Sequence, residues 1–183
     1  MRDTSANPNE GFTLWLTGLS GAGKSTLARM VADELRAQGR RVEVLDGDEV
    51  RAIGLGLGFS KEDRNKNVAL IGYVARLLSR NSVIAIVAAI SPFRSGRDGI
   101  RLAHDGRFIE AFVDCPLDAL IGRDPKGLYA KALRGEIQGF SGVSDPYEEP
   151  RHPEIHLHTG RESSEVSGRQ IVEYLRGHGF IAP

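Results

Sequence analysis

The residues with the clearest chemical meaning form one short glycine-rich segment. Gly18-Leu-Ser-Gly-Ala-Gly-Lys-Ser25 matches the pattern G-x-x-x-x-G-K-[ST] in full. Its glycines let the backbone fold around a phosphate with several N–H groups pointing inward, and the positive end of the following helix adds to this attraction. We expect Lys24 to reach the β and γ phosphates and the Ser25 hydroxyl to ligate Mg²⁺. The residues expected to bind ATP around this loop are Gly18, Ser20, Gly21, Ala22, Gly23, Lys24, Ser25 and Thr26.

Two carboxylates, Asp46 and Asp48, stand at the end of the next apolar run, residues 42–45. The carboxyl ends of parallel strands meet at one edge of a sheet, where ligands bind, so these acids should face the glycine-rich loop. This arrangement suits a kinase, because a kinase must orient a substrate hydroxyl near the γ-phosphate.

Other classes of nucleotide-binding protein fit the sequence less well. A GTPase needs a guanine-reading Asn-Lys-x-Asp, and the near match Asn65-Lys-Asn-Val68 lacks the aspartate. A Walker-B ATPase places an acid after a buried apolar strand, whereas the run 83–90 is followed by Ser91 and Pro92. The sequence therefore favours a kinase.

The elements that must position these residues alternate between strands and helices. Apolar and β-branched runs predict strands at 12–17, 42–45, 82–90, 108–113 and 155–157. Apolar residues at helical spacing predict helices at 24–38, 67–79, 95–103 and 166–176. Such alternation is typical of an α/β protein, and we expect a three-layer α/β/α fold with a doubly wound, mainly parallel sheet.

The segment from about 123 to 153 interrupts this alternation. It is rich in Gly, Pro, Lys and acidic residues, and it is long for a simple connection. We interpret it as a mobile lid over the active site. Residues 1–10 are polar and predict a flexible tail, so the expected organisation is a single kinase domain over residues 11–183.

The composition limits the possible partners and surroundings of the protein. Its 24 Lys and Arg residues balance 24 Asp and Glu residues, so the basic excess of a nucleic-acid binder is missing. The first ten residues lack an apolar signal-peptide core, and the longest near-apolar run is too short to span a bilayer. We expect no nucleic acid partner, no membrane partner and a cytoplasmic location.

The cysteine and the histidines carry little chemical signal in the sequence. Cys115 is the single cysteine and ends an apolar run, which predicts a buried structural thiol. His156 and His158 alternate on an expected short strand, but no third metal ligand stands at a suitable spacing. We therefore interpret these two histidines as part of a solvated face.

Seven motifs occur along the chain in an order that is more specific than any one of them. They are TGLSGAGKST (17–26), LDGDEVR (45–51), LGFSKEDR with Asn67 (57–64), ISPFR (90–94), FVD (112–114), RDPKGLY (123–129) and GFSG (139–142). From about residue 11 to the C-terminus the chain resembles the adenylyl-sulfate kinase family. The resemblance implies a P-loop kinase fold, a homodimer, a functional link to ATP sulfurylase, and phosphorylation of the 3′-hydroxyl of adenylyl sulfate by ATP with Mg²⁺ in sulfate activation.

The same resemblance assigns roles around the acceptor substrate. Asp48, with Asp46, would lie beside the 3′-hydroxyl and the Mg²⁺–ATP, with Asp48 reaching the metal through water. Arg51, Arg64 and Asn67 match positions that hold the phosphosulfate, where paired guanidinium donors suit oxyanions. The family positions that stack on or touch the rest of the substrate are Phe59, Ile90, Ser91, Lys126, Leu128, Gly139 and Phe140.

The roles of Ser91 and of the lid also come from the resemblance. In bacterial members the serine at this position is often described as a phosphoserine intermediate. Direct in-line transfer needs no covalent step, so we interpret the Ser91 hydroxyl as a hydrogen-bond donor in the catalytic site. Arg123 of the lid would approach ATP, and Lys126 would touch the substrate, so that closure excludes water. Glu49 departs from the asparagine that family members often carry and adds a negative charge beside a dianionic substrate.

Two other functions remain open at this point. One is a kinase for a different small molecule, such as another nucleotide or a sugar. The other is a non-catalytic nucleotide-binding module that regulates a partner such as a sulfurylase. The intact Lys24, Ser25, Asp46 and Asp48 argue against the second.

Overall fold

One parallel sheet forms the centre of the molecule. The computed structural model describes residues 10–53 and 56–182, so of the expected tail over residues 1–10 only Glu10 lies within the described part. The strands are β1 (Thr13–Thr17), β2 (Val42–Asp46), β3 (Ile84–Ala88), β4 (Phe108–Asp114) and β5 (Ile155–His158). Their order in the sheet is β2-β3-β1-β4-β5, and every neighbouring pair is parallel. The predicted parallel α/β sheet is thus confirmed.

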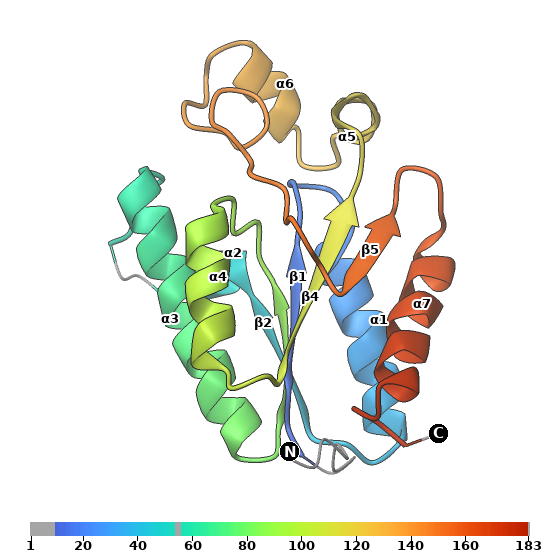
Figure 1. The fold of residues 1–183 in the computed structure, drawn as a ribbon. Helices are drawn as coiled ribbons and strands as arrows, with labels where there is room; N and C mark the ends of the chain where they lie inside the picture. Colours follow the sequence, from blue (N-terminus) through green and yellow to red (C-terminus); the bar gives the residue numbers. More distant parts are fainter. Residues whose placement is uncertain (1–9, 54–55, 183) are drawn as a thin grey trace.

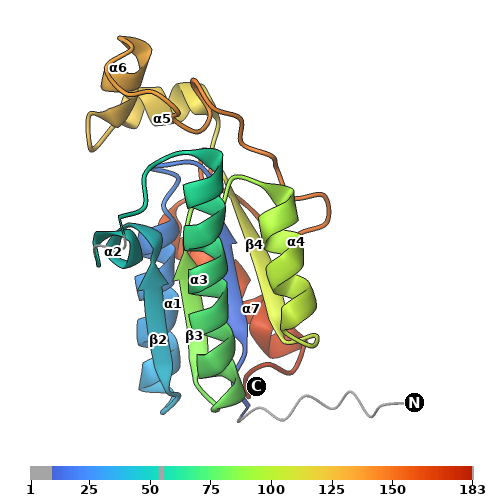
Figure 2. The same ribbon diagram turned by 90° about the vertical axis from the view of Figure 1, so that its left-hand side faces the viewer.

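Helices cover both faces of this sheet. Helices α1 (Lys24–Ala37) and α7 (Ser164–Gly177) lie on one face, and α3 (Lys61–Arg80) and α4 (Arg94–Ala103) lie on the other (Figures 1 and 2). The alternation of side chains along β1 explains why both faces are apolar. Leu14 and Leu16 belong to the core with α1 and α7, whereas Trp15 belongs to the core with α3 and α4. The expected three-layer, doubly wound arrangement is confirmed.

Three short helices were not predicted from the sequence. They are α2 (Gly47–Ala52), α5 (Leu117–Arg123) and α6 (Leu128–Leu133). Helices α5 and α6 lie beyond the carboxyl ends of the strands, at the top of Figure 1, while α2 follows β2 at the same end of the sheet (Figure 2). The segment expected to form a mobile lid therefore contains helix α6 and begins at the end of α5.

Helix α3 begins six residues earlier than its apolar spacing predicted. Ser60 caps its start by accepting a hydrogen bond from the Asp63 N–H, and Glu62 and Asp63 in the first turn favour the helix N-terminus. The first two turns present Arg64 and Asn67 to a cavity and not to the core, so apolar periodicity could not reveal them. Among the described residues, none of the helices combines the length and apolar character that a membrane span needs.

Candidate active site

The glycine-rich loop joins β1 to α1 and is held by its backbone neighbours. A side chain on Gly18, whose φ is +154°, would meet the carbonyl oxygen of Val113 on β4, so only glycine fits there. Gly23 precedes α1 in the left-handed conformation with a φ of 99°. On the other side, Thr159 Oγ1 donates to the Ala22 carbonyl at 2.8 Å. The loop is therefore supported by both β4 and the segment after β5.

Lys24 is the buried cation of this loop. Its ammonium donates to the carbonyl oxygens of Gly18 at 2.9 Å and Leu19 at 2.7 Å. Burial lowers the pKa of Lys24 to about 8, against the opposing effect of the nearby Asp48 and Asp46 carboxylates. A polyphosphate bound at the loop would place negative charge next to the Lys24 ammonium, whose hydrogen bonds in this structure go to carbonyl oxygens.

Ser25 and Asp46 form a second, oxygen-lined part of the site. The Ser25 hydroxyl donates to Asp46 Oδ2 at 2.6 Å, and Asp46 Oδ1 accepts from the Asp48 backbone N–H at 2.9 Å, capping α2. A serine hydroxyl beside a carboxylate is a donor set that suits Mg²⁺, a hard cation that prefers oxygen. Of the two aspartates expected beside the Mg²⁺–ATP, Asp46 accepts a hydrogen bond from Ser25, and Asp48 interacts with Lys126.

A single cavity of about 570 Å³ joins this loop to the residues expected around the acceptor. Eighteen of the predicted site residues line it: Ser20, Gly21, Gly23, Lys24, Ser25, Thr26, Asp46, Asp48, Arg51, Phe59, Arg64, Asn67, Ile90, Ser91, Lys126, Leu128, Gly139 and Phe140. The remaining lining residues were not predicted: Gly47, Val68, Ala88, Ala89, Pro92, Pro125, Ile137, Gln138 and Ser141. The small side chains of Ala88 and Ala89, at the end of β3, leave room in its floor.

Arg64 organises the acceptor side of the cavity. This buried side chain donates to the Phe59 carbonyl at 2.8 Å, to Ser141 Oγ at 2.9 Å and to the Gly139 carbonyl. Burial lowers its pKa, while Asp145 opposes that effect. Arg64 thus connects the start of α3 to residues 139–141, within the segment expected to form the lid.

Asn67, one turn further along α3, presents an unsatisfied polar group. Its side chain is 4% exposed, and its Oδ1 atom has no hydrogen-bond partner among the described residues. Because an unpaired buried carbonyl is costly, its position on the cavity wall indicates a place for a donor group of a ligand.

The two predicted aromatic residues stand on different supports. Phe59 is 63% exposed, and the Arg51 guanidinium lies over its ring at 4.9 Å from the centroid. Phe140 packs edge-to-face against the buried Tyr129 ring, with centroids 5.0 Å apart. Both rings line the cavity, so a planar base could contact both.

The segment expected to form the lid contacts both halves of the cavity. From α6, the Tyr129 hydroxyl donates to the Ser20 carbonyl of the glycine-rich loop at 2.8 Å, and burial raises the pKa of Tyr129 to about 12. Just before α6, Lys126 reaches Asp48 with an Nζ–Oδ2 distance of 3.1 Å. Asp124 accepts backbone hydrogen bonds from Tyr129 and Ala130, which lower the pKa of its carboxyl. Tyr129 was not predicted as a site residue, although it ends the motif RDPKGLY, because its partner Ser20 lies 109 positions earlier in the chain.

Ser91 lies on the cavity wall, but its hydroxyl points into the protein. The hydroxyl accepts from Trp15 Nε1 at 3.0 Å and donates to Thr17 Oγ1 at 3.0 Å, and the side chain is buried. This geometry supports neither the phosphoserine nor the substrate-donor interpretation. Ser91 instead connects the end of β1 to the segment after β3.

A buried ion pair that the sequence did not reveal supports the same region. Arg97 on α4 pairs with Glu110 on β4 at 2.7 Å, and both side chains are almost fully buried. The Arg97 guanidinium also donates to the carbonyls of Ser91 at 2.5 Å and Glu148 at 2.6 Å. Arg97 therefore fixes the backbone behind Ser91.

Three predicted ATP-binding residues do not line the cavity: Gly18, Ala22 and Arg123. Gly18 and Ala22 belong to the loop, where Gly18 packs against the Val113 carbonyl and the Ala22 carbonyl accepts from Thr159. Arg123, at the end of α5, donates to the Thr159 carbonyl at 3.1 Å and lies 3.7 Å from Cys115 Sγ. It stands behind the loop in this conformation. Cys115 is buried as expected, and burial raises the pKa of its thiol.

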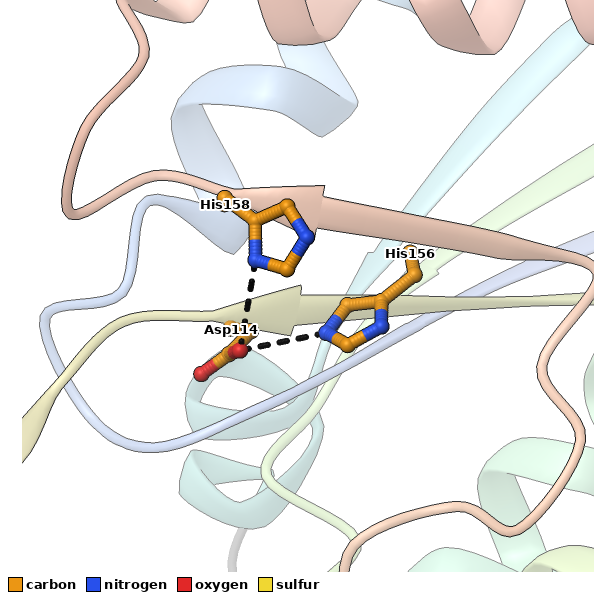
Figure 3. Close-up of side chains that lie close together, drawn as sticks. All are labelled: Asp114, His156 and His158. Carbon is orange, nitrogen blue, oxygen red and sulfur yellow. Dashed lines mark hydrogen bonds and ion pairs between the residues drawn. The ribbon is translucent and has the colours of Figure 1, made fainter.

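The structure confirms that His156 and His158 belong to a solvated face, but it adds a neighbour that the sequence did not reveal. Both side chains are exposed, but Asp114 on β4 lies beside them and provides the third possible metal ligand that their own strand lacked (Figure 3). Strand pairing brings Asp114 opposite His158, and such pairing is invisible to spacing along the chain.

Comparisons with known proteins agree with this geometry. The family model for adenylylsulphate kinase matches residues 10–158. An adenylyl-sulfate kinase of Picosynechococcus sp. is 48% identical over 176 residues, which are 96% of this chain and 99% of that protein. A probable bifunctional SAT/APS kinase 2 of Sorangium cellulosum is 53% identical over 172 residues, which are 93% of this chain but 29% of that longer protein.

A solved structure shares the whole arrangement. The APS kinase CysC of Mycobacterium tuberculosis, in complex with AMPPNP and APS, superposes with a TM-score of 0.87 at 39% identity, covering 92% of this chain and 99% of that chain. The family model, the full-length relative and the solved structure therefore all identify the same family. This chain belongs to the adenylylsulphate kinase family.

Proposed function

We propose that the protein uses ATP to phosphorylate the 3′-hydroxyl of adenylyl sulfate, giving 3′-phosphoadenylyl sulfate and ADP in sulfate activation. The observation that carries this proposal is the single cavity in which the phosphate-binding loop faces Asp48, Arg51, Arg64 and Asn67. One wall can hold a polyphosphate, and the other offers the guanidinium groups of Arg51 and Arg64 to the charge of an anionic nucleotide and the Asn67 amide oxygen to one of its donor groups.

On the nucleotide side, the backbone N–H groups of the loop and the N-terminus of α1 bind the phosphates. Lys24 needs only to leave the carbonyls of Gly18 and Leu19 to reach the β and γ phosphates. When bound, Mg²⁺ would neutralise charge on the phosphates. Ser25 would hold it, and Asp46, hydrogen-bonded to Ser25, would orient that hydroxyl and the metal's water ligands.

On the acceptor side, Arg51, Arg64 and Asn67 bind the phosphosulfate, and Phe59 and Phe140 hold the adenine ring. The five lie on the same cavity as the loop, which keeps the acceptor within reach of the γ-phosphoryl group. Lys126, which pairs with Asp48 in this structure, would turn to the negatively charged substrate when it binds.

Asp48 orients the 3′-hydroxyl and takes its proton. The hydroxyl oxygen forms the new bond to the γ-phosphorus while the bond from that phosphorus to the β–γ bridging oxygen breaks. The proton passes to the Asp48 carboxylate late in the transfer, and ADP leaves. We propose that the segment 123–153 closes over both substrates and excludes water, since Tyr129 and Lys126 already connect it to the two halves of the site.

The variant Asp48→Ala tests this proposal. We expect it to bind ATP normally and to lose about 100-fold or more of the turnover, the usual contribution of a positioned acid or base. A coupled assay of ADP release with adenylyl sulfate measures turnover, and calorimetry measures ATP binding. Asp98→Asn, a change to an exposed acid on α4, is the matched control and should keep full activity. Full activity of Asp48→Ala would remove Asp48 from the mechanism.

The same assay separates the alternative functions. A panel of nucleotide and sugar acceptors tests whether adenylyl sulfate is the preferred substrate. A wild-type protein that binds ATP but releases ADP only at the background rate with every acceptor would instead be a regulatory binding module.

We also propose that the protein is a cytoplasmic homodimer that works with an ATP sulfurylase. The family resemblance supports the dimer, and the fused Sorangium relative supports the link to a second activity of the same pathway. The proposed use of ATP as a substrate supports a cytoplasmic location. Sedimentation of the purified protein and fractionation of the producing cell test the assembly and the location.

A further inference from the structure

Three side chains outside the proposed active site converge at the edge of the sheet. Asp114 ends β4, and His156 and His158 lie on the edge strand β5 (Figure 3). The parallel register pairs Asp114 with His158 and Phe112 with His156. Because alternate residues of a strand point to the same face, both imidazoles lie on the face that carries the Asp114 carboxylate.

The distances between their ligand atoms fit one metal ion. Asp114 Oδ2 lies 3.1 Å from His156 Nε2 and 3.5 Å from His158 Nδ1, and all three atoms are within 4.8 Å of one another. Ligands bound to zinc at about 2.0–2.1 Å in a tetrahedron stand roughly 3.3 Å apart. We propose that Asp114, His156 and His158 form a binding site for one divalent transition-metal ion of the Zn²⁺ type.

The donor set selects the class of metal. Two neutral imidazole nitrogens and one carboxylate oxygen suit Zn²⁺ and its transition-metal neighbours, whereas Mg²⁺ prefers a shell made of oxygen atoms. The three side chains are 34–51% exposed, which leaves an entry path and room for water to complete the tetrahedron. His156 and His158 must present unprotonated nitrogens, so a metal would compete with protons for this site.

The surrounding structure holds the ligands in place. Ile155 and Leu157, which alternate with the two histidines, are buried in the core. The Phe112 ring packs beside the His156 ring with centroids 4.9 Å apart. Thr159, the next residue after β5, shares its one hydroxyl proton between the Ala22 carbonyl at 2.8 Å and the Asp114 carbonyl at 3.2 Å. The backbone of all three ligands is therefore fixed before any metal arrives.

The site also has a structural consequence. The Thr159 hydroxyl that contacts the Asp114 carbonyl also supports the phosphate-binding loop at Ala22. A metal that clamps β5 to β4 would stabilise this edge of the sheet next to the loop. The inference does not depend on the proposed transferase activity, because its residues lie outside the cavity of that site.

Zn²⁺ titration of the full chain, freed of any affinity tag and of metal, tests the proposal. We expect calorimetry to detect one Zn²⁺ per chain and the melting temperature to rise by several degrees with stoichiometric Zn²⁺. The double variant His156→Ala/His158→Ala should bind about 100-fold more weakly or not at all, because it removes two direct ligands. His152→Ala changes an exposed histidine outside the cluster and should bind as the wild type does.

Co²⁺ provides an independent readout. Its visible absorption should show a tetrahedral site in the wild type and in Asp48→Ala, but not in the double variant. A wild type that binds no Zn²⁺, a double variant with unchanged affinity, or Mg²⁺ binding as tightly at the same site would each overturn the proposal. The first outcome would leave the cluster as a carboxylate that pairs only with its two histidines.

Discussion

The two halves of the active-site cavity are built in different ways. The nucleotide half consists of backbone and buried groups. Lys24 is 8% exposed, Gly18 of the loop packs against the Val113 carbonyl, and Thr159 donates a hydrogen bond to the Ala22 carbonyl. The acceptor half presents exposed side chains, since Phe59 is 63% exposed and the Asp48 side chain is 75% exposed. We propose that the first half is preformed and that the acceptor and the lid complete the second.

This difference indicates which contacts of the cavity can adjust to the substrate and which are fixed by the fold. Backbone groups of the loop bind any triphosphate in the same way, so this half needs no adjustment for the acceptor. The acceptor half must recognise one small anionic nucleotide, and long side chains such as Arg51 and Lys126 can move to do so. Arg64 and Asn67 are exceptions, because both are buried, and Arg64 joins three parts of that half by hydrogen bonds.

Arg64→Ala should show the largest difference between its effect on the acceptor half and its effect on the nucleotide half. It removes the hydrogen bonds that hold Phe59, Gly139 and Ser141, so we expect kcat/KM for adenylyl sulfate to fall about 100-fold through misplacement of the acceptor. ATP affinity should stay within about twofold, because Arg64 does not contact the loop. Steady-state kinetics with each substrate varied, together with calorimetry for ATP, gives both values.

Arg29→Ala, at an exposed position of α1, is the control for the loss of one arginine. It should leave the kcat/KM for adenylyl sulfate and the affinity for ATP unchanged. If Arg64→Ala weakened ATP binding as much as acceptor use, the two halves would not be independent and the comparison would fail.

A pH series tests the nucleotide half. Burial lowers the pKa of Lys24 to about 8, and bound phosphates must raise it again because they favour the protonated form. ATP binding therefore takes up a proton above pH 8, and the affinity for a non-hydrolysable ATP analogue should fall about 30-fold between pH 7 and pH 9.5. Calorimetry in buffers of different ionisation enthalpy measures both the affinity and the proton uptake.

Stability does not explain such a loss of affinity. With its folded-state pKa below the unfolded value of 10.5, Lys24 makes the unfolded chain bind more protons between pH 8 and 10.5, so its contribution to the free energy of unfolding rises with pH there. Lys24→Arg keeps its charge and should show a much flatter pH dependence. A wild-type affinity that is constant to pH 9.5 would show that Lys24 is not the group that titrates.

The sequence predicted the parts of the molecule that depend on local patterns. The glycine-rich loop, the apolar strands and the amphipathic helices α1, α4 and α7 follow from residues close together in the chain. Most acceptor-side residues came from the family resemblance, and the structure brings them to the cavity. The short helices were missed because α2 buries no residue, and α5 and α6 are too short for a periodic pattern.

The features that the sequence did not reveal are contacts between distant segments. The Arg97–Glu110 pair, the contact of Tyr129 with Ser20 and the cluster around Asp114 all depend on strand order and register. The inward turn of the Ser91 hydroxyl depends on Trp15 and Thr17, which lie more than 70 positions earlier in the chain. A motif can identify a residue type at a site, but only packing decides which atom faces the ligand.

Lys126→Gln should have the smallest effect, and it tests whether the lid contact with Asp48 contributes to the resting fold or to the reaction. Both side chains of this pair are mostly exposed, and such pairs add little to stability, so the melting temperature should stay within about 1 °C of the wild type. We expect KM for adenylyl sulfate to rise about threefold with ATP affinity unchanged, because one cation fewer faces an anionic substrate. Higher salt should shrink that difference, since exposed charges are screened.

Lys131→Gln, an exposed lysine on α6, is the matched control. A marked fall in the melting temperature of Lys126→Gln alone would instead mean that the Lys126–Asp48 pair holds the lid in place, and the acceptor half would then be as preformed as the nucleotide half.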